Sequence, residues 1–508
     1  MKVNILFIYS QDHVHSPRAP LEFAEYMHLG ISYISSLLKR HGHRTRLAVL
    51  SPSYPRKSQI LLKRIIGDFA PRLVCYTAVS TQYDFIAGVA AHIAKYNPEI
   101  YQMIGGPHAS LNPEDVITGP FDALCVSEGE FPTLELISRL EADPGGVPSG
   151  IANLWIKREG EVERNPPRPF LKDLDSLPFP DRDIWAEWLV PLSNPRYSVL
   201  LGRGCPFECT YCSNHALKRL AVGPYVRYRL PDSILAEIQD LVARRPTVNE
   251  IYLEVETIGL HREWILDLCA KLETFNAGRR RPVSFGTNIR VTPNCDFSDI
   301  FAVMSRAHFS FINIGLESGS ERVRRDILRR NYSNEDVIRT VTQARAQGLR
   351  VSLFNLIGIP GETVADFELT IRMNRICRPD WHNTSIFYPY PGTLLHSLCK
   401  NSGLLGDRFR KEGVERFSAI LDLPEFPQSE IEKKYAWFDY SIYKGFKPLH
   451  RILPSVVQAK LRRFPRFLNL IRRVRVWSNK LKIADGFNEE SVKKSGELQT
   501  PVDRKNHP

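Results

Sequence analysis

Three cysteines near the middle of the chain have the spacing of a metal-cluster loop. They stand in the run Cys205-Pro-Phe-Glu-Cys209-Thr-Tyr-Cys212, four and three residues apart. Thiolates so close along the chain can converge on one centre, and soft sulfur ligands suit an iron–sulfur cluster or zinc. A [4Fe–4S] cluster has four irons, so three cysteines would leave one iron open to a small molecule.

Zinc is the alternative ligand for the same loop. His215 follows Cys212 by three residues and would complete a Cys3His tetrahedron, which is a structural form of zinc sites. The loop by itself is compatible with both an iron–sulfur cluster and zinc.

The loop also resembles the signature of the radical S-adenosylmethionine (radical SAM) enzymes, C-x-x-x-C-x-x-C with an aromatic residue, here Tyr211, before the last cysteine. The resemblance implies that Cys205, Cys209 and Cys212 hold a [4Fe–4S] cluster whose open iron chelates SAM. In that family an electron from the cluster cleaves SAM to a 5'-deoxyadenosyl radical. A reductant such as flavodoxin or ferredoxin would supply the electron.

Strand–helix alternation from about residue 195 predicts the frame that positions this loop. A capping box at Ser333 begins one of the intervening helices, and Gly348 ends it. Six such units predict an open, partial (β/α)6 relative of the TIM barrel, with its site at the carboxyl ends of the strands. The expected strands are 197–202, 250–253, 282–286, 309–315, 350–357 and 384–388.

The ends of these strands carry further segments that resemble the radical SAM family. The run 315–320 is similar to its segment for SAM ribose and carboxylate, and the run 355–363, with G-x-P-G-E-T, to its adenine-contacting segment. Tyr390 begins the closing Pro-Gly-Thr motif and is the candidate catalytic residue. The segment around Glu256 departs from the family form. The resemblance implies SAM contacts by Tyr211, Glu256, Arg290, Glu317, Ser318, Gly358 and Pro360.

The first 145 residues show a second strand–helix alternation. Apolar runs at 3–9, 46–50, 73–78, 100–104 and 123–126 predict strands, and amphipathic stretches at 30–39, 58–68 and 85–95 predict helices. This order predicts a doubly wound parallel sheet, Rossmann-like or flavodoxin-like, whose ligand lies beyond the carboxyl ends of the strands. No G-x-G-x-x-G follows the first strand, which argues against a dinucleotide.

This sheet resembles the cobalamin-binding domain that precedes the barrel in one large subclass of radical SAM enzymes. The segments that match are 28–30, 105–108 and 127–130. The cobalt-coordinating motif D-x-H-x-x-G is missing after the first strand, as it commonly is in that subclass. A flavodoxin-like sheet without cofactor is the alternative. The cobalamin candidates are Ser10, Thr77, Ser80, Gly105, Gly106, His108, Glu128 and Gly129.

The chain therefore divides into five predicted parts. They are a cobalamin-binding domain (1–145), a connector with a small hairpin (146–190), the radical SAM barrel (191–400), a basic, mainly helical region (401–484) and a polar, disordered tail (485–508).

The net charge of +12 has a local origin. Twelve Lys or Arg and no Asp or Glu lie between Lys444 and Lys482, and the rest of the chain is neutral. This stretch is basic and amphipathic, which allows two interpretations. Either its basic face is solvated while its apolar residues pack on the barrel, or it makes peripheral contact with an anionic membrane. Nucleic acid is not expected to be a partner, because no binding module accompanies the charge.

Composition favours the cytoplasm, with contact at the inner face of the membrane as an option. The amino terminus reads as a strand rather than a signal peptide, and no run of about 18 apolar residues is present. The six cysteines outside the loop are scattered among apolar neighbours, as in proteins of reducing compartments.

The resemblance implies an enzyme in which methylcobalamin donates a methyl group to an unactivated carbon of a small-molecule or lipid-like biosynthetic intermediate. A second SAM would remethylate the cobalamin. The alternative is a cyclase or rearrangement enzyme of the same subclass. A non-catalytic cobalamin or iron–sulfur sensor that binds nucleic acid is more remote. A methylthiotransferase is disfavoured, because the three additional cysteines of such enzymes are missing from the amino-terminal domain.

Overall fold

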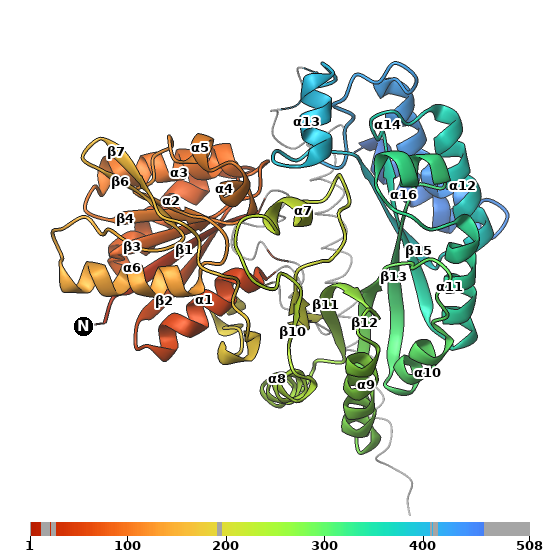
Figure 1. The fold of residues 1–508 in the computed structure, drawn as a ribbon, viewed down its shortest axis with the longest axis horizontal. Helices are drawn as coiled ribbons and strands as arrows, with labels where there is room; N and C mark the ends of the chain where they lie inside the picture. Colours follow the sequence, from red (N-terminus) through yellow and green to blue (C-terminus); the bar gives the residue numbers. More distant parts are fainter. Residues whose placement is uncertain are drawn as a thin grey trace, which may run out of the picture.

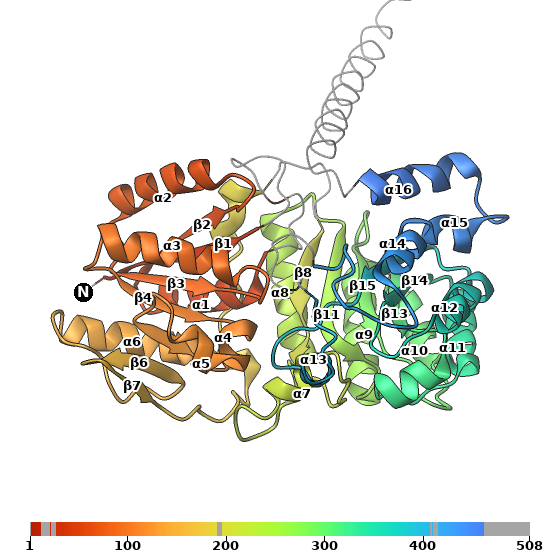
Figure 2. The same ribbon diagram turned by 90° about the horizontal axis from the view of Figure 1, so that it is seen from above.

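The chain folds into two α/β lobes that lie side by side, with a group of helices at the carboxyl end (Figures 1 and 2). The computed structural model describes residues 2–11, 21, 27–189, 196–406, 409 and 415–461. The predicted polar tail and most of the basic stretch lie outside the described residues. None of the helices in the described residues is long and apolar enough to cross a membrane.

The amino-terminal lobe is built on a seven-stranded sheet of order β2-β1-β3-β4-β5-β6-β7. The first five strands in this order are parallel, which confirms the predicted doubly wound sheet, and the predicted hairpin extends it with two antiparallel strands. The strands are β1 (Asn4–Ser10), β2 (Arg44–Leu50), β3 (Leu73–Thr77), β4 (Tyr101–Gly105), β5 (Ala123–Cys125), β6 (Leu154–Arg158) and β7 (Glu161–Arg164).

Helices cover both faces of this sheet, as βαβ crossovers require. Helix α1 begins at His28, whose Nδ1 accepts a hydrogen bond from the Ile31 N–H at 3.2 Å. Burial lowers the pKa of His28 to about 4, so the ring stays neutral and serves as the cap. The helices are α1 (Leu29–Arg40), α2 (Pro55–Phe69), α3 (Tyr83–Tyr96), α4 (Pro107–Leu111), α5 (Pro113–Val116) and α6 (Glu130–Ala142).

The second lobe is a curved sheet of six parallel strands in the order β15-β14-β13-β12-β11-β8, which confirms the predicted open barrel. The last strand begins and ends earlier than its apolar run suggested, because Pro389 and Pro391 keep the following residues out of the ladder. The strands are β8 (Tyr197–Leu200), β11 (Glu250–Ile258), β12 (Ser284–Ile289), β13 (Phe309–Glu317), β14 (Arg350–Ile357) and β15 (Trp381–Ile386); β9 (Gly202–Arg203) and β10 (Arg227–Tyr228) form a separate ribbon.

Helices α8 to α12 lie on the outer side of the barrel sheet (Figure 1). The capping box predicted at Ser333 is present, with Asp336 as its partner, and a second one pairs Thr363 with Asp366. A π-helical turn covers Val323–Ile327. The helices are α7 (Asn214–Leu217), α8 (Pro231–Arg244), α9 (Arg262–Ala277), α10 (Ser298–Arg306), α11 (Asn334–Ala346), α12 (Val364–Cys377) and α13 (Leu394–Asn401).

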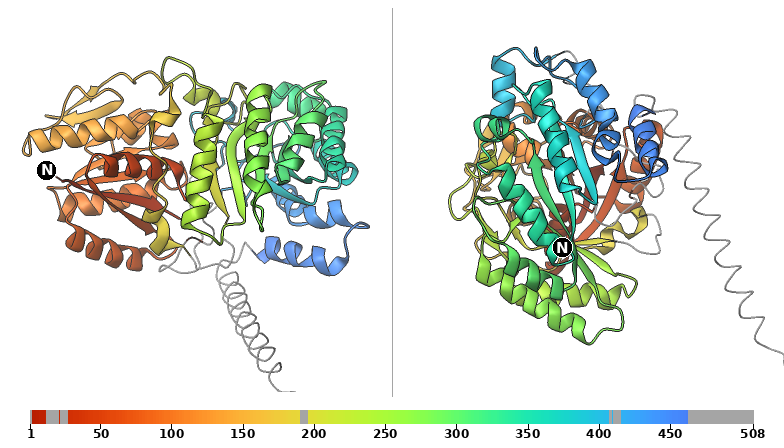
Figure 3. Two further views of the ribbon diagram at one scale, coloured as in Figure 1. Left: turned by 90° about the horizontal axis from the view of Figure 1, so that it is seen from below. Right: turned by 90° about the vertical axis from the view of Figure 1, so that its right-hand side faces the viewer.

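Three helices follow the barrel, namely α14 (Gln428–Ala436), α15 (Phe438–Tyr443) and α16 (Leu449–Leu461). They pack on the barrel lobe and not on the amino-terminal lobe (Figure 3). Their buried side chains join the end of the barrel in one hydrophobic cluster that includes Phe367, Phe426 and Phe438.

Candidate cofactor site

The cluster loop lies between β9 and α7 and carries three unpaired cysteines. Cys209 is buried, and Cys205 and Cys212 are partly exposed. Arg290 Nη1 lies 3.0 Å from the Cys209 sulfur and Asn214 Nδ2 lies 3.5 Å from the Cys212 sulfur. Both are donors, so they favour sulfur in the thiolate form that binds metal. This donor pattern fits a thiolate-bound cluster.

Burial works in the opposite direction on the free thiols. It raises the pKa of Cys205 to about 11 and also raises the pKa of Cys212. A bound cluster must therefore displace the protons, which couples metal binding to proton release.

The alternative zinc site is not assembled in the described residues. In the described residues no three His, Cys, Asp or Glu side chains are grouped as ligands of a single ion. His215 Nδ1 lies 3.1 Å from the carbonyl oxygen of Cys209, so the ring contacts the backbone of the loop. In a [4Fe–4S] cluster each thiolate binds a different iron, and a single meeting point is not required.

A buried triad stands beside the loop. Arg330 Nη1 donates to the hydroxyl of Tyr211 at 2.6 Å and to Glu317 Oε1 at 2.8 Å. Glu317 ends β13 with a φ of 60°, a left-handed conformation that non-glycine residues rarely adopt. Gly315 makes room for the triad, since a Cβ there would lie 2.5 Å from Glu317 Oε1. Sequence reasoning found Tyr211 and Glu317 but missed Arg330, which belongs to no motif.

Two other SAM candidates also come close to the loop. Glu256 is exposed near the end of β11, and its charge contributes to raising the pKa of Cys205 and Cys212. Arg290 follows β12 and lies with its guanidinium 3.7 Å from the ring centroid of Phe207.

The segments around Ser318 and Gly358 are shaped by internal hydrogen bonds. Ser318 is fully buried, and its hydroxyl accepts from the Ser320 N–H at 3.2 Å. Glu362 Oε2 accepts from the N–H groups of Gly358 at 2.7 Å and Ile359 at 3.2 Å, and burial raises the pKa of Glu362 to about 8. Glu362 thus braces the Gly358–Pro360 turn from beneath.

The carboxyl edge of the amino-terminal sheet gathers most of the cobalamin candidates. Gly106 has a φ of 96°, and a Cβ there would lie 2.6 Å from Thr77 Oγ1, so backbone forms this part of the edge. Ser80 Oγ lies 3.0 Å from His108 Nδ1. Among the described residues, His108 Nε2 and Ser10 Oγ are buried without a hydrogen-bond partner. Such orphaned polar atoms fit an edge that receives a polar ligand.

Glu128 has partners other than the cobalamin contact that the sequence suggested. Its carboxylate accepts from Arg203 at 3.0 Å, from Arg227 at 2.9 Å and from the Leu171 N–H at 2.8 Å. Glu130 adds a second ion pair to Arg203 at 2.5 Å. These buried contacts join the amino-terminal lobe to the barrel. The adjacent Gly129 packs toward Ile34.

A second connection between the lobes passes through Glu415. Thr81, which follows β3, donates to Glu415 Oε2 at 2.6 Å, and the hydroxyl of Tyr390, which follows β15, donates to Glu415 Oε1. Burial and Glu415 raise the pKa of Tyr390, so its hydroxyl keeps its proton. Glu415 was missed because the sequence after residue 400 carries no motif.

The comparisons with known proteins agree with both halves of this site. The family model of the radical SAM superfamily matches residues 199–373, and that of the B12 binding domain matches residues 24–137.

Two curated relatives cover most of the chain. An uncharacterized methyltransferase of Pyrococcus horikoshii is 27% identical over 80% of this chain and 85% of its own length. The anaerobic magnesium-protoporphyrin IX monomethyl ester cyclase of Rubrivivax gelatinosus is 26% identical over 77% of this chain and 69% of its own.

Two solved structures share the fold. The radical SAM methyltransferase TsrM from Kitasatospora setae, with cobalamin and a [4Fe–4S] cluster bound, has a TM-score of 0.62 at 15% identity and covers 80% of this chain and 79% of its own. The cobalamin-dependent SAM radical enzyme OxsB has a TM-score of 0.66 at 14% identity, and the match covers 92% of this chain and 72% of its own.

The cofactors predicted from the sequence, a [4Fe–4S] cluster, SAM and cobalamin, are thereby confirmed. The chain thus carries a domain of the radical SAM superfamily preceded by an amino-terminal B12 binding domain.

Proposed function

We propose that this protein transfers a methyl group to an unactivated carbon of a small-molecule substrate. The observation that carries the proposal is the link Thr81–Glu415–Tyr390, which joins the carboxyl edges of the two sheets. Ligands of both folds bind at these edges. A substrate held between them would reach both cofactors without a change in the arrangement of the lobes.

In this proposal the protein's own residues bind the cofactors and orient them. When bound, the cofactors supply reductive cleavage of SAM and a transferable methyl group. In this proposal Cys205, Cys209 and Cys212 hold the cluster, and Arg290 and Asn214 orient its sulfur ligands.

The remaining candidates divide between the two edges. The Tyr211–Arg330–Glu317 triad and the Gly358–Pro360 turn form the SAM side. Gly105, Gly106, Ser10 and His108 form the cobalamin side.

Tyr390 acts in this proposal as a positioning residue. Its hydroxyl is a hydrogen-bond donor to Glu415 and its raised pKa keeps it protonated, so it does not serve as a base. It holds Glu415 at the junction, where that carboxylate can orient a substrate.

A cyclase or rearrangement enzyme is the second candidate, because one of the relatives is named a cyclase. In either case a one-electron reductant such as flavodoxin or ferredoxin would serve the cluster. We place the protein in the cytoplasm on its unpaired cysteines, which suit a reducing compartment.

The two candidates are separated by the fate of a labelled methyl group. Anaerobic, cobalamin-loaded protein is reduced and mixed with SAM that carries a deuterated methyl group. Methyl transfer predicts about one equivalent of S-adenosylhomocysteine per cobalamin, with the label retained on the protein's cobalamin. Formation of 5'-deoxyadenosine without S-adenosylhomocysteine would overturn methyl transfer and favour the cyclase reading.

A further inference from the structure

Helix α16 (Leu449–Leu461) presents buried and exposed apolar side chains on two adjoining faces. Ile452 and Val456 are buried in the hydrophobic cluster at the end of the barrel. Leu449, Leu453 and Val457 are 54%, 42% and 51% exposed and recur every fourth residue, so they form a stripe on the outer face. Leu449, Leu453 and Val457 do not belong to any hydrophobic core of the described residues. Isolated apolar residues on a surface are normal, but three that line up along one helix form a contiguous patch, which is typical of an interaction site.

The surroundings of this stripe are basic. Lys444, Arg451 and Lys460 are exposed, and no Asp or Glu occurs between residues 444 and 461. Of the nearby acids, Asp439 is bound by His382 at 2.7 Å and by Ser455, and the Asp380 carboxylate accepts from the Val351 N–H at 2.8 Å. The outer face of α16 is therefore apolar and cationic.

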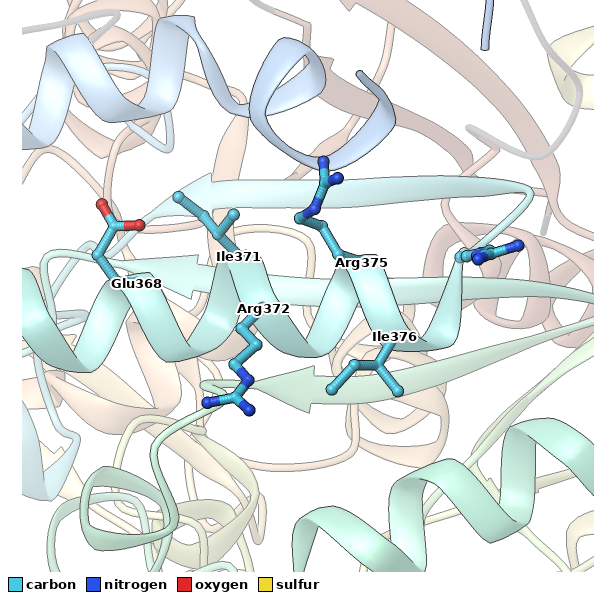
Figure 4. Close-up of a pocket in the computed structure, with 6 residues that line it drawn as sticks. Glu368, Ile371, Arg372, Arg375 and Ile376 are labelled. Atoms are coloured by element: carbon cyan, nitrogen blue, oxygen red, sulfur yellow. The ribbon is translucent and has the colours of Figure 1, made fainter. Parts of the chain in front are cut away.

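Phe446 connects the stripe to a second cationic feature. It is 41% exposed, and the guanidinium groups of Arg375 and Arg378 lie 5.0 Å and 4.3 Å from its ring centroid. Both arginines line a hollow of about 510 Å³ on the outer face of α12, together with Arg372, Ile371, Ile376 and Glu368 (Figure 4). The charge of Glu368 is paired with Lys434, so the hollow keeps a positive character.

These elements are held firmly on the barrel. Arg375 Nη1 donates to the carbonyl oxygens of Ser441 at 2.9 Å and Lys444 at 3.1 Å, and Lys447 Nζ donates to that of Asp380 at 2.7 Å. Asp380 immediately precedes β15, so the surface lies near the amino ends of the barrel strands. The cluster loop and α7 lie on the opposite side, as Figure 2 shows for α7 and α16.

We propose that Phe446 and the outer face of α16 form a docking surface for an anionic lipid bilayer. Leu449, Leu453, Val457 and Phe446 would enter the interfacial region while the lysines and arginines meet lipid phosphates. A symmetric dimer through this surface fits less well, because it would place cations against cations. The sequence continues from residue 462 to 482 with eight more Lys or Arg and no acid, which adds charge of the same sign.

Docking in this way anchors the protein and leaves the cofactor edges facing away from the lipid. The surface by itself therefore does not deliver substrate from the membrane. Binding to a bilayer is therefore independent of the proposed methyl transfer.

The test uses full-length, cofactor-loaded protein and flotation with two kinds of vesicle, phosphatidylcholine alone and phosphatidylcholine mixed with phosphatidylglycerol. We expect binding to the anionic vesicles only, weakened by salt. Leu453→Glu should weaken this binding about tenfold or more, because it removes an inserted side chain and adds a repelled charge. Ile60→Glu is the matched control, since Ile60 is 71% exposed on α2 in the other lobe.

Unchanged iron, cobalt and melting temperature would show that the Leu453→Glu protein is folded. The proposal is overturned if the parent protein does not bind anionic vesicles, or if Ile60→Glu weakens binding as much as Leu453→Glu. Equal binding by Leu453→Glu and the parent would also overturn it, and would assign any binding to the basic residues after 461. A change of oligomeric state in Leu453→Glu would identify a second copy as the occupant instead.

Discussion

The two sheet edges that meet at the site prepare for their ligands in different ways. On the barrel edge the polar groups are already paired, as in the Tyr211–Arg330–Glu317 triad and in the turn braced by Glu362. On the amino-terminal edge the backbone is partly exposed at Gly106, and Ser10 Oγ and His108 Nε2 are buried without partners in the described residues.

The difference follows from the chemistry that each edge must accommodate. A charged ligand such as SAM gains from a preorganised set of charges, because no reorganisation is needed on binding. A large ligand held along its rim by many weak polar contacts gains from a flat backbone surface and free donors and acceptors. We therefore expect each edge to bind its cofactor independently of the other. A substitution at one edge should abolish binding of one cofactor while binding of the other is measured.

The largest effect is expected at the cluster loop. Cys209→Ala removes one of three thiolates and should abolish both iron binding and formation of 5'-deoxyadenosine, while cobalt remains at one equivalent. Iron and cobalt analysis of anaerobically purified protein measures both. Cys295→Ser, at a partly exposed cysteine outside the loop, should keep its iron. Loss of cobalt together with iron in Cys209→Ala would contradict independent edges.

The reciprocal change is Gly106→Ala. A side chain at a φ of 96° is strained, and its Cβ would press on Thr77 Oγ1. Strain of this kind costs about 1 to 3 kcal/mol, so cobalamin retention should fall about tenfold or more while iron stays unchanged. Gly88→Ala in α3, where a Cβ meets nothing within 4 Å, is the control. Normal cobalamin retention in Gly106→Ala would remove this residue from the cobalamin edge.

The buried triad predicts a loss of stability when it is broken. Arg330→Met leaves Glu317 as an unpaired buried carboxylate, which costs about 3 to 5 kcal/mol of the free energy of unfolding. Adding Glu317→Gln should recover part of this loss, because the stranded charge is removed. Thermal unfolding measures both variants.

Arg322→Met provides the contrast for the triad, since Arg322 forms a half-exposed pair with Asp366 and should cost no more than about 1 kcal/mol. Equal destabilisation by Arg330→Met and Arg322→Met would mean that the barrel edge is not preorganised by its buried charges.

The sequence predicted these two edges unequally. Hydrophobic periodicity and short sequence motifs were sufficient to predict both sheets. Buried parallel strands appear in the sequence as apolar runs, and the barrel loops carry recognisable motifs. Arg330, Arg203 and Glu415 could not be found in this way. Each makes a contact between segments that lie far apart in the sequence, from 73 residues for Arg203–Glu130 to 334 for Thr81–Glu415. No local pattern encodes such a pair.

The partners of Glu128 have the same long-range origin. Glu128 is predicted as a cobalamin contact from its place after β5, and in the structure Arg203 and Arg227 of the other lobe engage its carboxylate. Its position in a motif placed Glu128 at the carboxyl edge of the amino-terminal sheet. Its ion-pair partners come from the second lobe, so the motif could not predict them.

A pH dependence of stability originates at Glu362. Burial raises the pKa of this carboxyl to about 8 in the folded protein, above the ordinary value of 4.5. Its contribution to stability is therefore complete below pH 4.5 and is lost as the pH rises through about 8. Between these values the parent protein should lose up to about 1.4 kcal/mol of the free energy of unfolding per pH unit relative to Glu362→Gln, which cannot ionise.

Thermal unfolding from pH 5.5 to pH 8.5 compares the parent, Glu362→Gln and Glu425→Gln, whose carboxyl is exposed in the same lobe. We expect the curves of the parent and Glu362→Gln to converge at low pH and to separate at high pH, with Glu362→Gln the more stable there. Glu425→Gln should follow the parent throughout. Parallel curves for the parent and Glu362→Gln would mean that the carboxyl is ionised in the folded state, and that the turn at Gly358 is braced by a charged group like the rest of the barrel edge.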